Sequence, residues 1–188
     1  MSFRLRLVSA CMVTLLASGC AQLVAPSYSS DYASLDRLKS TRPEKTSIAT
    51  FQPTDPNHAV NNLTLRGARL KSPSGSFAKY LENALIGDLK EISVYDPGAS
   101  TRIDAVIQHN EMAIGGINTG EGLMDVELTV TRAGTERLRK IYQARTSFES
   151  SFAGAVAIPK GQSEYPNLVR TLVRNVYSDP AFITAIGK

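Results

Sequence analysis

Hydrophobic and polar positions along the chain predict two amphipathic helices separated by strands. In "SPSGSFAKYLENALIGDLKEI" apolar residues recur at steps of three and four between Phe77 and Leu89, behind a serine that can cap the helix. The segment "SEYPNLVRTLVRNVYSDPAF" repeats this pattern, with Pro166 suited to its first turn and Asp179 and Pro180 at its end. Each segment therefore predicts a helix with one face in a core.

Strict alternation predicts a long β-hairpin in the second half of the chain. Apolar residues occupy the even positions from Met124 to Val130, and again the even positions of the segment that follows the turn. The two apolar faces coincide if a three-residue loop, Ala133 to Thr135, joins the strands. Val130 then pairs with Leu138, and Lys140 must extend past the core to reach solvent.

Other strands complete the predicted sheet. Short strands are expected at Ser47–Phe51 and Leu63–Leu70, the second broken or bulged at Gly67. The apolar positions change parity between Ile107 and Met112, which predicts a β-bulge near residues 109–111 or a switch between the two faces of the sheet. The order strand, helix, several antiparallel strands, helix predicts an α+β two-layer sandwich, in which two helices pack on one face of an antiparallel or mixed sheet.

The N-terminus has the order of a secretory signal. Arg4 and Arg6 precede an apolar stretch from Leu7 to Ser18, which is too short to span a bilayer because a spanning helix needs about 20 apolar residues. The following "LASGC" resembles the bacterial lipobox, at which a peptidase cuts before a cysteine whose thiol carries diacylglycerol. Leu16 lies four residues before Cys20, whereas the family usually has leucine at three. An ordinary signal peptide that is cut elsewhere is the alternative.

A cleavage site before Cys20 divides the chain into three predicted parts. Residues 1–19 form a removed signal peptide, residues 20–46 a lipidated cysteine with a flexible tether, and residues 47–188 a single α+β periplasmic domain. A coil of the tether's length would hold the domain about 28 Å from the lipid. An aspartate directly after the lipidated cysteine resembles an inner-membrane retention signal in enteric bacteria. This chain has Ala21 at that position, so we expect an anchor in the outer membrane and a domain that faces the periplasm.

Charge and cysteine content narrow the function classes. Without the signal peptide the chain has 19 basic and 17 acidic residues, and this net charge of +2 does not indicate nucleic-acid binding. Cleavage also removes Cys11, so no intramolecular disulfide or cysteine metal site is expected. The glycine-rich "GGINTGEG" lacks the lysine and the following helix of a phosphate-binding loop. We expect no cofactor.

Candidate catalytic groups are few. His109 and Glu111 share one strand parity, which could place an acid beside a base or two metal ligands together. The only other histidine, His58, lies in a predicted loop, so the chain has too few suitable ligands for a three-ligand zinc site. A hydrogen-bonded histidine at a bulge is the alternative. No Gly-x-Ser-x-Gly motif accompanies the serines of "FESSFAGAVAIP". We therefore expect no metal and no enzyme activity.

Two segments are candidates for contacts with other molecules. The hairpin of residues 132–145 has a local net charge of +4, and its arginines could meet phosphate-bearing lipids or an acidic partner. Solvated strand charges, partly matched by Glu127, are the alternative. The uncharged stretch from Phe152 to Ile158 is either a buried crossing or a surface for an apolar partner. The candidate contact residues are Arg132, Arg137, Arg139, Lys140 and Arg145 in the hairpin, and Phe152, Val156 and Ile158 in the uncharged stretch.

The whole layout resembles small periplasmic lipoproteins. A lipobox at Cys20, a polar segment, a strand, a helix, antiparallel strands and a closing helix are similar to the lipopolysaccharide-assembly lipoprotein and to auxiliary lipoproteins of ABC-type lipid transporters. The stretches "SFAGAVAIP" and "SDPAF" resemble parts of uncharacterised proteobacterial lipoproteins. The resemblance implies a non-enzymatic subunit of an envelope protein complex in lipid transport or envelope assembly. A stand-alone binder of anionic lipid or glycan is the alternative, and a hydrolase is the least favoured function.

Overall fold

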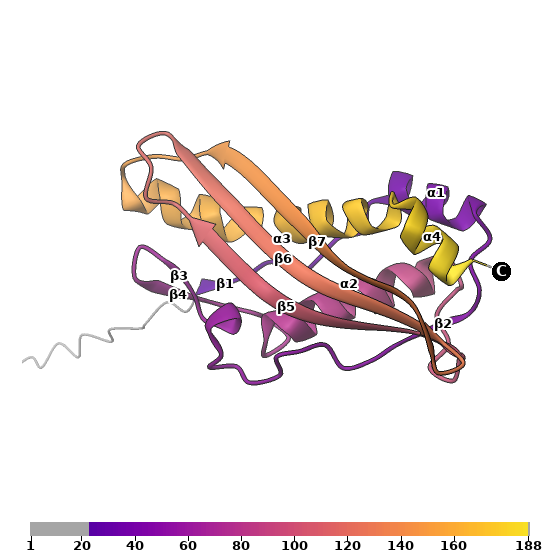
Figure 1. Cartoon of the computed structure of the whole chain (residues 1–188). Helices are drawn as coiled ribbons and strands as arrows, with labels where there is room; N and C mark the ends of the chain where they lie inside the picture. The colour runs from indigo at the N-terminus through magenta and orange to yellow at the C-terminus, as the bar shows by residue number, and fades with distance from the viewer. Residues whose placement is uncertain (1–22, 188) are drawn as a thin grey trace, which may run out of the picture.

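A layer of long antiparallel strands covered by helices forms the body of the protein (Figure 1). The computed structural model describes residues 23–187. Its elements in chain order are β1 Leu23–Val24, α1 Tyr32–Ser40, β2 Thr46–Ile48, a 3-10 turn Ala59–Asn61, β3 Leu63–Leu65, β4 Ala68–Lys71, α2 Phe77–Glu91, β5 Thr101–Ala113, β6 Thr119–Arg132, β7 Thr135–Glu149, α3 Gly154–Tyr177 and α4 Pro180–Ile186. They form a four-stranded sheet in the order β2-β5-β6-β7 and a three-stranded sheet in the order β1-β4-β3.

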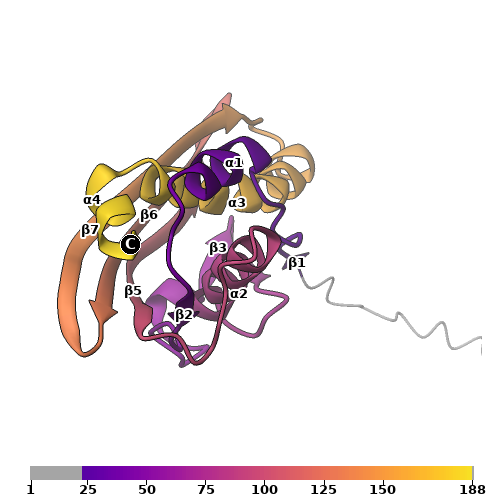
Figure 2. The same cartoon turned by 90° about the vertical axis from the view of Figure 1, so that its right-hand side faces the viewer.

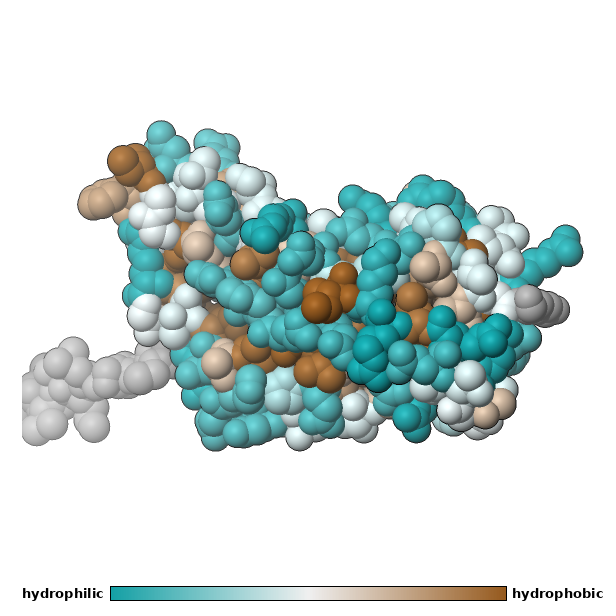
Figure 3. Space-filling view, in the orientation of Figure 1, coloured by the Kyte–Doolittle hydropathy of each residue, from teal (hydrophilic) through white to brown (hydrophobic). Residues whose placement is uncertain are grey.

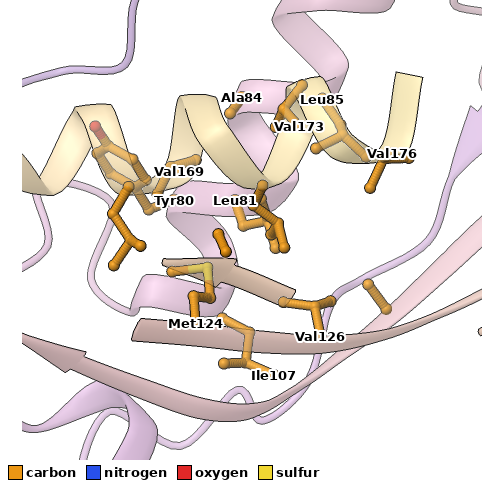
Figure 4. Close-up of a cluster of buried hydrophobic side chains, with 14 of the residues drawn as sticks. Tyr80, Leu81, Ala84, Leu85, Ile107, Met124, Val126, Val169, Val173 and Val176 are labelled. Atoms are coloured by element: carbon orange, nitrogen blue, oxygen red, sulfur yellow. The ribbon is translucent and has the colours of Figure 1, made fainter. Parts of the chain in front are cut away.

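Helices α2 and α3 cover the same face of the four-stranded sheet, as the view along the molecule shows (Figure 2). Between these layers, side chains from all three elements meet in one core, among them Leu81 of α2, Val173 of α3 and Met124 of β6 (Figure 4). Both sheets are mixed, because β1 and β2 each pair in parallel with their neighbours. The predicted α+β two-layer fold is thus confirmed.

Helix α2 forms where the periodic pattern predicts it. Ser76 caps the helix, since its hydroxyl accepts a hydrogen bond from the backbone N–H of Lys79 at 3.0 Å. Phe77 then enters the core, where its ring centroid lies 4.5 Å from that of Tyr165 in α3. This aromatic contact ties the two helices together beneath the sheet.

The β6–β7 hairpin has the predicted pairing but a different turn. Val130 lies opposite Leu138, as predicted. The loop, however, has two residues, Ala133–Gly134, both with positive φ, and the strands regain the predicted register through a shift directly after Val130. A bulge therefore supplies the extra residue that was assigned to the loop. The parity change in β5 is also a bulge, because the register shifts between Ile107 and His109.

Residues 63–70 form a hairpin: the chain is broken at Gly67, as one of the two predicted alternatives has it, and the other alternative, a bulge in a continuous strand, is wrong. Strands β3 and β4 pair antiparallel around a two-residue turn, in which Arg66 has φ of 49° and Gly67 has φ of 83°. Two successive positive φ angles are typical of the type I′ turn that joins adjacent strands. The pattern did not indicate this turn because a non-glycine residue such as arginine seldom adopts positive φ.

Helix α3 begins twelve residues before the predicted first turn at Pro166, at Gly154, and contains Pro159 and Pro166 in its interior. A proline inside a helix costs about 3 kcal/mol, and here the buried contacts of the helix outweigh that cost. Gly161 permits a close approach to β5 and the residue after it, since a Cβ at this position would lie 2.7 Å from Cγ2 of Ile114. None of the helices within residues 23–187 has the length and apolar content that a membrane crossing requires.

Candidate functional site

Residues 23–46 pack against the domain, so the predicted flexible tether is wrong for this part of the chain. Strand β1 pairs in parallel with β4, and Asp31 caps helix α1. Helix α1 buries Leu35 and Leu38. A few apolar side chains suffice because backbone pairing and the helix cap also hold the segment. The predicted signal peptide, residues 1–19, and the predicted lipidation site, Cys20, lie outside the described residues.

Residues 23–31, which we call the N-terminal strap, cross helices α2 and α3. Their backbone carbonyl groups accept hydrogen bonds from side chains of both helices. The contacts are Gln162 Nε2 to Val24 O at 2.7 Å, Tyr80 Oη to Pro26 O at 2.8 Å, Arg170 Nε to Ser29 O at 3.0 Å, and the ion pair of Arg174 Nε with Asp31 Oδ2 at 2.8 Å. The point at which the chain enters the described structure, Leu23, is therefore fixed to the domain.

A buried carboxyl group lies beneath the strap. Asp88 of α2 is 0% exposed, and its Oδ2 accepts a hydrogen bond from the Tyr28 hydroxyl at 2.9 Å. Oδ1 has no hydrogen-bond partner among the described residues. Burial raises the pKa of the Asp88 carboxyl above its usual range, and the hydrogen bond from Tyr28 opposes this shift only in part. Folding therefore shifts the protonation equilibrium of Asp88 toward its neutral form, relative to an exposed aspartate.

This raised pKa has a testable effect on stability. A folded-state pKa above the unfolded value of about 3.9 means that the folded protein binds more protons, so stability falls as pH rises through this interval. Asp88→Asn removes the titrating group. We expect the unfolding free energy of the wild type minus that of Asp88→Asn to fall as pH rises from about 4 through the raised pKa of Asp88.

Urea unfolding at several pH values measures this difference. Asp31 and Asp179 have lowered pKa values and act in the opposite direction, with stability lost as pH falls. Both groups are present in the two proteins, so their effects cancel in the difference. If the unfolding free energy of the wild type minus that of Asp88→Asn stays constant or grows with rising pH, the pKa of Asp88 is not raised by burial.

The outer face of the four-stranded sheet is not covered by a helix. Val106 of β5 and Ile141 of β7 lie on either side of Glu127 in the strand pairing and are 43% and 47% exposed. Figure 3 looks onto this face and shows hydrophobic atoms between polar ones. Strand β7 is the last strand of the sheet, so its outer edge has no strand partner among residues 23–187. Asn175 of α3 donates to the carbonyl group of Gln143 at 2.8 Å, so the face and the part of the edge that α3 leaves free form the surface open to a partner.

Three of the five basic residues of the hairpin form ion pairs with different parts of the domain. Arg139 pairs with Glu127 and Glu136 at 2.8 and 2.7 Å, Lys140 with Asp179 at 2.8 Å, and Arg132 with Glu44 at 3.4 Å and with the carbonyl groups of Ala185 and Gly187. Lys140 reaches its partner past the edge of the core, as predicted. Arg137 and Arg145 also lie on β7, but at separate places. The predicted cationic residues therefore do not form one continuous basic surface.

His109 and Glu111 come together at the bulge of β5. Nε2 of His109 lies 3.2 Å from a carboxylate oxygen of Glu111, and both side chains are exposed. No group of three or more His, Cys, Asp or Glu side chains in the described part of the chain is placed to hold a metal ion. A shallow hollow of about 330 Å³ beside this pair is lined by Glu111, Glu121 and Arg145 among others. The geometry matches the alternative of a hydrogen-bonded histidine at a bulge.

The uncharged stretch after β7 divides between surface and core. Phe152 is 76% exposed and Val156 is 57% exposed, whereas Ile158 is partly buried against the core. A further exposed apolar residue, Ile117, was not predicted as a contact residue. Its position inside the glycine-rich "GGINTGEG" loop was the available signal, because an isoleucine in such a loop has little to pack against.

Comparisons with known proteins give remote structural likeness only. No protein-family model matches the chain, and no match was found among curated proteins. A putative lipoprotein from Caulobacter crescentus is 12% identical, with a TM-score of 0.47 over 84% of this chain and 98% of its own. A Xanthomonas campestris protein of the DUF330 family is 9% identical, with a TM-score of 0.44 over 71% of this chain and 81% of its own. TM-scores below 0.5 are too low to assign a function.

Proposed function

We propose that this chain is a lipid-anchored bacterial envelope protein that acts by binding and not by catalysis. The lipobox-like sequence before Cys20 supports the anchor. Ala21 after that cysteine favours the outer membrane, with the domain facing the periplasm. The Caulobacter crescentus neighbour carries the description of a lipoprotein too, but its TM-score gives that likeness no weight here.

The uncovered sheet surface carries the binding part of the proposal. Strand β7, Thr135–Glu149, is an edge strand beside the exposed Val106 and Ile141, and α3 covers part of its edge through the hydrogen bond from Asn175 to the carbonyl group of Gln143. Unpaired strand edges readily add a strand from another chain, and natural proteins usually protect them. We propose that an envelope protein binds this face and edge, and that the chain is an accessory subunit in lipid transport or envelope assembly.

Binding of anionic lipid or glycan alone is the less favoured function. The arginines that would bind phosphate groups are largely matched within the domain, and an ion pair that already satisfies a guanidinium leaves less charge for a lipid headgroup. The two remaining positions, Arg137 and Arg145, lie eight residues apart on β7. The surface therefore favours a protein partner.

Site-specific crosslinking tests the proposed partner surface. We expect a photoreactive residue at Gln143, which is exposed on β7, to give one discrete crosslinked product in intact cells. Ile141→Asp, which places a charge in the apolar part of the face, should remove that product without lowering the amount of anchored protein. The matched control is a photoreactive residue at Lys39, exposed on α1. Equal products from Gln143 and Lys39, or none from the outer face, would contradict the proposal.

A further inference from the structure

Two uncharged segments meet at one end of the molecule. Residues 114–118 connect β5 to β6, and residues 150–156 connect β7 to α3 and form its first residues; neither contains a charged side chain. The backbone N–H of Ser150 donates to the carbonyl group of Asn118 at 2.8 Å. Arg66, in the β3–β4 turn, donates from its guanidinium to carbonyl groups on both segments. We call these joined segments the apolar tip.

The tip exposes large hydrophobic side chains. Ile117, Phe152 and Val156 are the three most exposed large hydrophobic residues of the described chain apart from Tyr32. In Figure 3 hydrophobic atoms project at the upper left, where Figure 1 shows the β5–β6 loop and the start of α3. Arg66 bonds to the carbonyl groups of Ile114, Ser151 and Phe152, and Val156 lies in the first turn of α3, so both segments of the tip are attached to the domain.

The N-terminal strap enters the domain at this same end. Gln162, which binds the carbonyl group of Val24, is six residues along α3 from Val156, a distance of about 9 Å along a helix. Strand β1 runs parallel to β4, so its N-terminal side faces the Arg66 turn that holds the tip. Figure 1 shows β1, the β3–β4 hairpin and the start of α3 together at the left end.

Chain length then limits how far the anchor can be from the domain. Cys20 precedes Leu23 by three residues, which span at most about 10 Å even when fully extended. If Cys20 carries lipid, its backbone lies at the membrane surface. The end of the domain that bears the apolar tip must therefore lie close to the bilayer, and not about 28 Å away as the flexible tether would have it.

We propose that the apolar tip, with Ile117, Phe152 and Val156, inserts into the lipid bilayer that holds the Cys20 anchor and fixes the orientation of the domain on it. This inference rests on the proposed lipidation of Cys20. Uncharged loops with exposed isoleucine, valine and phenylalanine suit the boundary between headgroups and acyl chains, where their apolar side chains leave water. The opposite end, with α1, α4 and the β6–β7 turn, then points away from the membrane (Figure 1).

This orientation has a consequence for the partner surface. The long axes of β5, β6 and β7 run from the tip toward the far end (Figure 1). With the tip in the bilayer, the uncovered sheet face stands out from the membrane and is accessible from the periplasm. The basic residues near the β6–β7 turn are held away from the anchoring bilayer, which agrees with the lesser role of anionic lipid proposed above.

Single labels on the full-length lipidated protein test the insertion. The mature chain would have Cys20 alone, acylated, so Phe152→Cys or Ile117→Cys supplies the sole free thiol for an environment-sensitive fluorophore. On vesicles of phosphatidylethanolamine and phosphatidylglycerol, we expect blue-shifted emission from both positions and loss of quenching by aqueous iodide. Lys39→Cys on α1, at the opposite end, should remain fully quenched.

The outcomes separate this inference from the proposed function. Labels at residues 117 and 152 that are quenched as strongly as the label at residue 39, on protein with a confirmed lipid at Cys20, overturn the insertion and leave the anchor intact. Labels shielded in native membrane fragments but not on pure lipid would mean that the tip binds a protein, which also overturns it. A mature protein without lipid on Cys20 overturns both. Because all three positions are exposed, none of the substitutions disturbs the core.

Discussion

Replacing Phe77 with alanine is expected to lower the unfolding free energy by about 3–5 kcal/mol, the range found when a fully buried phenylalanine is truncated. Phe77 is buried at the start of α2, against Tyr165 of α3. Its removal leaves a cavity where the two helices meet. Urea unfolding should show a lower midpoint with an unchanged slope, because the surface exposed on unfolding changes little.

Phe152→Ala is the matched control for this prediction. It removes the same side chain from an exposed position, so its effect should stay within about 0.5 kcal/mol. A loss of less than about 1 kcal/mol in Phe77→Ala would mean that Phe77 does not fill the helix interface as described. Equal losses in the two variants would contradict the assignment of one phenylalanine to the core and the other to the surface.

Replacing Cys20 with alanine is expected to abolish labelling with palmitate and to release the protein from the membrane fraction. The thiol is the proposed attachment point for diacylglycerol, so Cys20→Ala leaves no group at this position that can be acylated. The apolar tip alone cannot replace the anchor, because a few inserted side chains bind a membrane reversibly, as even a single acyl chain does. Metabolic labelling and membrane flotation measure both effects.

Cys11→Ala provides the control for this experiment. Cys11 lies within the predicted signal peptide, so its substitution should leave both labelling and flotation unchanged. Labelling that persists in Cys20→Ala, at any residue, would overturn the anchor. Release that occurs equally in both variants would indicate a general loss of export in place of a loss of lipid.

The sequence was sufficient for elements whose apolar pattern is long and regular. Helix α2 and the register of β6 with β7 follow from periodicity alone, because one slipped residue would turn an entire apolar face outward. The turn of that hairpin was assigned wrongly, since a three-residue loop and a two-residue loop with a bulge satisfy the same parity. Parity determines the pairing of the strands but not the place of the extra residue.

Tertiary contacts determine the conformation of the segments that the apolar pattern did not predict. The apolar residues of the strap follow no helix or strand period, and the strap is held largely by hydrogen bonds to side chains more than 50 residues away, such as Tyr80 and Gln162, which no local pattern can indicate. The first part of α3 contains Gly154, Pro159 and Gly161, and glycine and proline have the lowest helix propensities. The contact of Gly161 with Ile114 gives this part a place in the core.

The candidate surfaces were predictable only as uncharged or charged stretches. Phe152 and Val156 were candidates for apolar contact, and both are exposed, but nothing local indicated that residues 114–118 lie beside them. The basic hairpin was predicted from a local excess of charge. Its ion pairs with distant residues, such as Asp179 for Lys140, arise only in the folded chain.

Mass spectrometry of the N-terminal peptide, from protein extracted from membranes with mild detergent, tests the central claim most directly. The account predicts that the mature chain begins at Cys20 and that this residue carries diacylglycerol, so that the lipid lies three residues from the ordered strap at Leu23. A mature N-terminus at any other residue, or an unmodified Cys20, would contradict both the anchor and the orientation of the domain that depends on it.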